Sequence, residues 1–301
     1  MFKNVRLYRL EDPSAIDAED LEQRLSERRF RPCGPLQTAS LGWHPPLGEQ
    51  TRALTHAGNG CITLCTRRQE RLLPATVVGE ALDERVADIE DREARTVGRR
   101  ERRQLREEVM IEMLPRAFTR SRRIHTYLDL ISGWMLVDVA SEKGAEELVA
   151  LLRETLGSFR VYPPRPRNDP IAIMTRWVAT GDLPADLELG DMCELRDARD
   201  ERALVRCSGQ DLEAEEIATH LRAGKQVIRL AVRWRKHLEL VVQEDLSLKR
   251  LKFADALLET AQEPDIEDPR ARFDAEFALM VLQLRALIEH LEAVFEMVGE
   301  A

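Results

Sequence analysis

Residues 124–140 read IHTYLDLISGWMLVDVA, and this stretch is the strongest single indication of the fold. Two apolar runs, rich in β-branched and aromatic residues, flank Ser132-Gly133, a pair typical of a tight turn. The stretch therefore predicts a β-hairpin of 124–131 with 134–140. Directly after it, Ser141 can cap a helix that continues to Leu156. A hairpin joined to a helix in this way is typical of an α+β protein with antiparallel sheets and packed helices.

A long charged helix is predicted upstream of the hairpin, over residues 75–113. Its apolar residues recur at close to the helical repeat, and Leu114-Pro115 ends the pattern. Between Glu90 and Gln104 almost no residue is apolar, so we expect this portion to be solvated on most sides, like an arm. A helix of ~35 residues would reach ~50 Å, and Gly98 could interrupt it.

A second α+β unit is predicted downstream, after a proline-rich linker at 163–170. It contains a hairpin of 225–234 with 237–243, followed by a strand at 248–253. From about Pro269, apolar residues keep to one wide stripe of a C-terminal amphipathic helix. Such a stripe requires a partner, either another helix of the chain or a second subunit.

The length of 301 residues allows more than one domain. We predict an elongated, multi-lobed subunit. Its domains are an N-terminal α+β lobe formed by 1–74 and 114–165, a helical arm at 75–113, a second α+β lobe at 166–254, and a C-terminal helical segment at 255–301.

The composition is that of a globular protein, with 44% hydrophobic and 33% charged residues. The apolar stretches are short and interrupted by charge, so no membrane-spanning segment is expected. The N-terminus lacks the apolar core of a signal peptide, which makes the cytoplasm the expected location. The chain has five cysteines, and an odd number in a long chain does not suggest a disulfide framework.

The net charge of −9 at first argues against a nucleic-acid partner, but the charge is segregated along the chain. The segment 92–123 has eleven arginines against five glutamates, a net charge of +6. The segment 222–252 has nine basic residues against three acidic ones, also +6. The remainder must then carry −21, which suggests basic surfaces for a polyanion on an otherwise acidic protein.

No convincing catalytic motif, cofactor site or metal site is found. Gly58-Asn59-Gly60 precedes a strand, so a hairpin turn explains it better than a dinucleotide site. Cys61 and Cys65 with His56 could bind zinc, and Cys33 near His44 or His56 could be a nucleophile, but small buried thiols are the simpler interpretation. The acidic segment 182–201 could supply magnesium ligands for a nuclease, although it is more typical of a solvated surface.

The two basic segments are the better candidate for a site. Phosphates follow each other about every 1.7 Å along a duplex, so a binder needs many cations in a row, and the guanidinium fork suits phosphate oxygens. The candidate DNA-binding residues are Arg92, Arg95, Arg99, Arg100, Arg102, Arg103, Arg116, Arg120, Arg122, Arg123, Lys225, Arg229, Arg233, Arg235, Lys236, Lys249, Arg250 and Lys252. The alternative is that the arginine- and glutamate-rich helix is simply solvated.

Recognition of specific bases is not expected. The sequence has neither zinc-finger spacing nor a short recognition helix with Asn or Gln beside arginine, and aromatic residues make up only 5%. Contacts to the phosphate backbone should therefore dominate any DNA binding.

Several blocks of sequence resemble the RdgC family of recombination-associated proteins over about residues 2–298. The blocks are FKNVRLYRL at 2–10, PCG at 32–34, GWHPPLG at 42–48, ALTH at 53–56, LPRAF at 114–118, SLKRLKF at 247–253 and RFDAEF at 272–277. The stretch 183–210 departs most from the family pattern, which puts in doubt any contact it would make in closing a ring.

The resemblance implies a non-enzymatic protein that forms a ring-shaped homodimer around double-stranded DNA. It implies binding without sequence preference, association with the nucleoid, and restraint of the recombinase RecA through occupation of its DNA. No catalytic residue and no cofactor are implied. Phe118, beside Arg116 and Arg120, is interpreted as a core residue, with a subunit contact as the alternative. A metal-dependent nuclease and a protein-interaction module that acts on the recombinase itself remain rival hypotheses.

Overall fold

The computed structural model describes residues 1–49, 51–257 and 268–297. Its helices and strands follow one another as β1 (Val5–Leu10), η1 (Pro13–Ala15), α1 (Ala18–Glu27), β2 (Ala39–His44), β3 (Thr55–Gly58), β4 (Cys61–Leu72), α2 (Ala75–Glu93), α3 (Arg99–Met113), η2 (Leu114–Arg116), β5 (Phe118–Asp129), β6 (Trp134–Asp138), α4 (Glu142–Leu156), β7 (Val161–Tyr162), α5 (Pro170–Thr180), β8 (Leu187–Asp197), β9 (Leu204–Ser208), α6 (Glu215–Arg222), β10 (Lys225–Trp234), β11 (Leu238–Gln243), β12 (Leu248–Phe253) and α8 (Pro269–Phe295). The protein is α+β with an antiparallel sheet, as predicted.

One sheet runs through the body of the molecule, in the order β2-β4-β5-β6-β1-β12-β11-β10-β8-β9, with β3 paired to β4 and β7 paired to β1. The first strand lies in the middle, paired with β6 over five residues but with β12 only through Val5 and Leu248. The predicted hairpin is confirmed as β5 and β6, and Gly133 supplies the positive φ of +73° that its turn requires.

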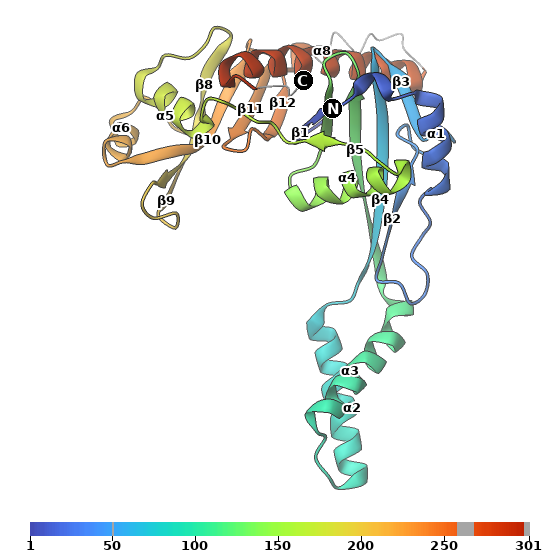
Figure 1. Cartoon of the computed structure of the whole chain (residues 1–301). Coiled ribbons are helices and arrows are strands. Elements are labelled where there is room, and N and C mark those ends of the chain that lie inside the picture. Colours follow the sequence, from blue (N-terminus) through green and yellow to red (C-terminus); the bar gives the residue numbers. More distant parts are fainter. Residues whose placement is uncertain (50, 258–267, 298–301) are drawn as a thin grey trace.

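Helices cover the sheet unevenly. Along one face lies α8, the helix drawn in red across the top of Figure 1, together with α5 and α6. In this core Trp177, Trp234 and Phe295 are almost fully buried. A second core lies on the other face, where α1 and α4 pack on the strands from β2 to β6. The amphipathic stripe of the C-terminal helix therefore finds its partner within the chain.

A buried ion pair fastens α8 to the hairpin. Arg285 donates from Nε and Nη2 to the two carboxylate oxygens of Asp129, at 2.8 and 2.9 Å, and Asp129 is 1% exposed. The same carboxylate accepts the backbone N–H groups of Ile131 and Ser132 in the turn. These bonds lower the pKa of Asp129 against the opposing effect of burial, so the carboxylate stays ionised.

The prediction of one long helix at 75–113 is wrong. The segment forms two antiparallel helices, α2 and α3, that project from the rest of the molecule as an arm (Figure 1). The chain reverses between Ala94, whose φ is +49°, and Gly98, which directly precedes α3, so the interruption expected at Gly98 is confirmed. The reversal lets Leu82 and Val86 of α2 pack on Leu105 of α3, which buries an apolar stripe that a single solvated helix would expose.

No helix in the described ranges is long and apolar enough to cross a membrane.

Candidate nucleic-acid interface

The strands β4 and β5 continue beyond the core as a paired ribbon that leads to the arm. Residues 118–123 of β5 are all exposed, whereas 124–129 turn into the core. Across the ribbon, Arg123 lies opposite Arg67 and Arg122 lies opposite Arg68. The sequence reasoning missed Arg67 and Arg68, although their position in the run CTRRQER at 65–71 could have indicated them once β4 was extended past residue 66.

The ribbon's arginines are partly neutralised. The Arg68 guanidinium bonds Glu70 at 2.6 Å and Glu147 of α4 at 2.9 Å. The hydrogen bond from Arg68 to Glu70 lowers the pKa of Glu70. Longer ion pairs join Arg122 to Glu147 at 3.7 Å and Arg120 to Glu70 at 3.6 Å. The third candidate residue of the ribbon, Arg123, lies 3.9 Å from Glu49.

The arm holds two kinds of arginine. Arg95 is clamped near the helix reversal by Glu93 at 2.5 Å and Glu101 at 2.6 Å, which raises its pKa. Arg102 pairs with Asp83, and looser pairs hold Arg92 to Asp88 at 3.8 Å and Arg103 to Glu107 at 3.6 Å. In contrast, Arg99 and Arg100 in the first turn of α3, and Arg116 in η2, are exposed and make no ion pair with a described residue.

On the β8–β12 part of the sheet, the face turned away from α8 is polar. Beyond the register shift between Val227 and Arg229, the alternation of β10 directs Leu230 and Val232 into the core, and Arg229 and Arg233 to the opposite face. There Glu194, with a side chain 5% exposed, lies between Arg229 at 3.2 Å and Arg206 at 2.9 Å.

Two further candidate residues of β10 also form ion pairs. Arg233 is shared by Glu188 at 3.3 Å and Glu239 at 3.6 Å. Lys225 at the start of β10 lies 3.5 Å from Asp197.

Three basic residues of this region have a left-handed backbone conformation with a positive φ. In the β10–β11 turn, Arg235 has a φ of +46° and Lys236 a φ of +62°, and Arg250 in the β12 bulge has a φ of +54°. Asn or Gly is the ordinary choice for such positions. Arg235 lies 4.6 Å from the Trp234 ring centre and 3.0 Å from Asp186, while Lys236 and Arg250 are exposed without a described ion pair.

The structure places Lys249 away from any surface interface. It is 9% exposed, and its Nζ donates to the carbonyl oxygen of Ala140 at 2.8 Å. Burial and the nearby Arg6 guanidinium lower the pKa of this ammonium to about 8. The assignment of Lys249 to the DNA-binding set is therefore corrected. Its ammonium joins β12 to the backbone that follows β6.

Taken together, eleven of the eighteen candidate residues lie within 4.0 Å of a described carboxylate. Apart from the pair to Glu194, most of these contacts are solvent-exposed, and exposed ion pairs are worth only about 0–1 kcal/mol. A phosphate can therefore replace such a carboxylate at low cost. The six candidates that are exposed without a described ion pair are Arg99, Arg100, Arg116, Lys236, Arg250 and Lys252.

Phe118 is not a core residue. Its side chain is 85% exposed, and it lies directly opposite Leu72, which is 43% exposed. Ile111 near the end of α3 is also exposed. The base of the arm thus presents large apolar side chains to solvent, so the alternative interpretation of Phe118 as a subunit contact stands.

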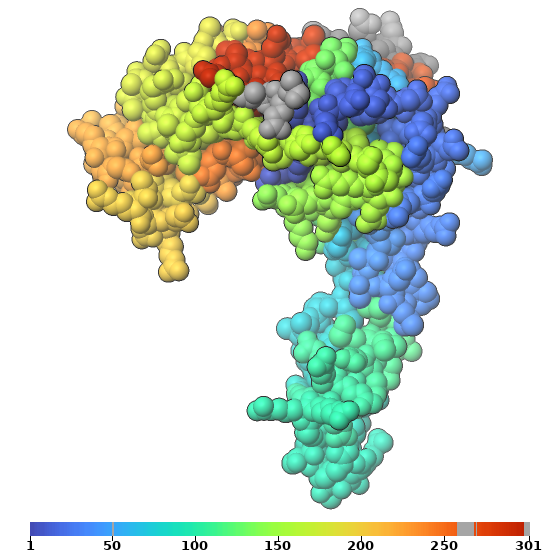
Figure 2. Space-filling model, viewed as in Figure 1, coloured from blue at the N-terminus to red at the C-terminus, as the bar shows by residue number. Residues whose placement is uncertain are grey.

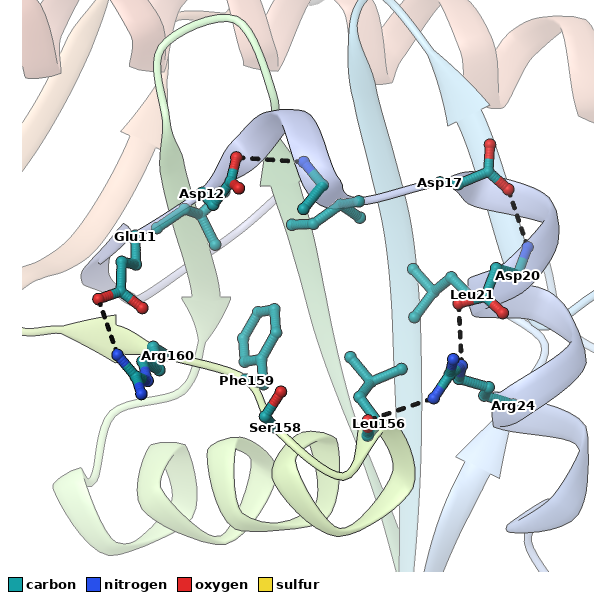
Figure 3. A pocket seen from close by; sticks show the side chains of 13 residues that line it. Glu11, Asp12, Asp17, Asp20, Leu21, Arg24, Leu156, Ser158, Phe159 and Arg160 are labelled. Carbon is teal, nitrogen blue, oxygen red and sulfur yellow. Dashed lines mark hydrogen bonds and ion pairs between the residues drawn. The ribbon is translucent and has the colours of Figure 1, made fainter.

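A pocket of about 400 Å³ lies between α1 and the end of α4, beside several acidic side chains (Figure 3). Its carboxylates already have partners. Asp12 and Asp17 cap helices, and Arg24 bonds Asp20. In the described ranges no three His, Cys, Asp or Glu side chains are arranged to hold a metal ion, and this includes the acidic segment 182–201.

The cysteines and histidines considered for zinc or nucleophilic chemistry have other partners. His56 bonds Asp274 at 2.5 Å, Cys61 accepts from Arg285, and Cys65 contacts His125 at 3.8 Å. Burial raises the pKa values of Cys61 and Cys65 to about 12. These thiols therefore remain protonated.

Comparison with known proteins identifies the family. The family described as "Putative exonuclease, RdgC" matches residues 1–298. The chain belongs to the RdgC family. A recombination-associated protein RdgC from Halorhodospira halophila is 45% identical over 290 residues, and the proteins of the same name from Yersinia pestis and Yersinia pseudotuberculosis are 40% identical. Each alignment covers 96% of both chains.

The names of these relatives point to recombination and do not name a catalysed reaction. The family description alone refers to an exonuclease. Membership of the RdgC family therefore supports an association with recombination.

Proposed function

We propose that this RdgC-family protein binds double-stranded DNA without reading its sequence. In this proposal it acts as a non-enzymatic homodimer that closes into a ring of multi-lobed subunits around the duplex, associates with the nucleoid in the cytoplasm and limits the access of the recombinase RecA to DNA. The single observation that carries the proposal is the set of six exposed cations without a described ion pair, which are distributed over the arm, its base and the polar sheet face.

The shape of the subunit supports this proposal. Figure 2 shows the arm protruding at a steep angle from the body, so that the arm and the β8–β12 part of the sheet flank a re-entrant angle. The polar sheet face lies opposite α8, and α8 runs along the outer side of that angle (Figure 1). Cations from stretches more than one hundred residues apart in sequence would then approach the same polyanion.

The exposed apolar base of the arm supports self-association. A second copy can bury Phe118 and Leu72, which are both exposed here. We expect Phe118→Ser to raise the dissociation constant of the dimer without lowering thermal stability of the monomer, as measured by sedimentation and calorimetry. Leu282→Ser, at a leucine that is 61% exposed on α8 and far from the arm, is the control. Equal self-association of the Phe118 variant and the wild type would exclude this contact.

Binding to DNA is tested by titrating two unrelated duplexes of equal length at several salt concentrations. Equal affinities and a steep loss with salt are expected, because phosphate contacts release counterions. A preference for one sequence would contradict the proposal. Closed circular DNA should retain the dimer longer than a short linear duplex if the protein encircles its ligand.

Two rival functions have distinct outcomes. The family description favours a nuclease, which would shorten labelled duplex DNA when magnesium is added. A module that acts on the recombinase directly would bind RecA after all DNA has been digested. The proposal requires that the protein neither cut DNA nor hold RecA without it.

A further inference from the structure

Two cysteines face each other across the last two strands of the sheet. Cys193 of β8 and Cys207 of β9 are directly opposite in the antiparallel register. Directly opposite residues have Cα atoms about 4.5 or 5.5 Å apart, and both separations fall within the range of about 4.4–6.8 Å that a disulfide spans. All five cysteines lie in the described part of the chain, and the structure has them as free thiols.

The two thiols differ in their surroundings. Cys193 is fully buried, and burial together with the adjacent Cys207 raises its pKa to about 12. Cys207 is only half-buried and lies on β9, which ends the sheet. Solvent-borne oxidants can therefore reach Cys207 first, because reactivity follows exposure and thiolate content.

We propose that Cys193 and Cys207 form a reversible dithiol–disulfide site that responds to peroxide. The Cys207 thiolate attacks hydrogen peroxide, which leaves Cys207 as a sulfenic acid and releases hydroxide. The sulfur of Cys193 then attacks the sulfenic sulfur, and water leaves as the S–S bond forms. In sum, two thiols and one peroxide give one disulfide and two waters, so the thiols are oxidised and the peroxide is reduced.

The bond would fix the edge strand to its neighbour. β9 pairs with β8 over five residues, and Leu204 at its start is half-exposed. An edge strand with unpaired backbone groups opens readily and can pair with other chains. A covalent link between the two strands would suppress this opening while the protein is oxidised, and a cellular thiol would reverse it.

The full-length protein can be treated with hydrogen peroxide, blocked with an alkylating reagent and digested with trypsin. Arg196, Arg199 and Arg202 lie between the two cysteines, so trypsin separates them unless a disulfide joins the peptides. We expect one joined peptide pair, lighter by two hydrogen atoms than the sum of its parts, that dithiothreitol separates. Hydrogen exchange at 204–208 should slow after oxidation and recover on reduction.

Two variants assign the roles. Cys193→Ala should leave a Cys207 sulfenic acid that dimedone traps, and Cys207→Ala should leave Cys193 unmodified. Cys33→Ser is the matched control, because Cys33 is also half-buried but donates to the Gln69 carbonyl oxygen and faces no thiol. If peroxide over-oxidises or spares Cys207 in the wild type without joining the peptides, the proposal is overturned.

Discussion

Replacing Arg99 and Arg100 by alanine should reduce the salt dependence of DNA binding. Each released phosphate contact contributes about 0.9 to the slope of log affinity against log salt. Six exposed cations without a described ion pair would thus give a slope of about −5 per subunit. The double variant should lower its magnitude by about 1.8 per subunit, so that a fourfold rise in salt weakens the wild type about 12-fold more per subunit than the variant.

The assay is fluorescence anisotropy with a random duplex at four salt concentrations. Arg24→Ala with Arg28→Ala is the matched control, because it removes the same charge from α1, where both arginines already bond carboxylates. The control should retain the wild-type slope. An unchanged slope in the Arg99/Arg100 variant, or an equal change in the control, would refute the assignment of these arginines to phosphate contacts.

Three further predictions concern stability. Arg285→Met leaves the buried Asp129 carboxylate without its guanidinium. The free energy of unfolding, measured by urea titration, should therefore fall by about 3–5 kcal/mol. A loss below about 1 kcal/mol would be inconsistent with a buried ion pair. Lys249 has a pKa of about 8 when folded, against 10.5 for an ordinary lysine, so the unfolded chain holds the extra proton between these values. Stability relative to Lys249→Met should therefore rise with pH across this window, by at most about 3 kcal/mol, and a flat difference would disprove the shift. Ala94→Gly should raise the melting temperature, since glycine adopts the left-handed conformation with less strain, gaining about 0.5–1 kcal/mol; a lower melting temperature would contradict this.

The sequence predicted local structure well where periodicity and caps agreed. Ser141 caps α4 as expected, and α8 begins at Pro269 with its apolar stripe buried. The arm shows the limit of this reasoning. The helical repeat of apolar residues is the same whether 75–113 is one helix or two, and Ala94 carries no signal of a left-handed turn. Only the packing of Leu82 and Val86 on Leu105 decides between them.

The candidate site was predictable in composition but not in detail. Counting charges located both basic segments, yet it could not show that Glu194 is buried between Arg206 and Arg229. It also could not place Lys249 inside the protein, because alternation along β12 is broken by the bulge at Arg250. Phe118 is exposed because the β4–β5 ribbon extends beyond the hydrophobic core. This extension is a property of the tertiary structure and cannot be read from the local sequence.

The central position of β1 has a consequence for synthesis on the ribosome. Its pairing with β6 can form once about half of the chain has emerged, and β7 then pairs with Arg9 and Leu10, but Val5 waits for β12, which begins 110 residues after the end of β6. Until then the nascent chain carries an open strand edge, which invites aggregation. Contacts of such long sequence separation also slow folding, so we expect refolding to end with a slow step in which β12 and α8 dock on the N-terminal half.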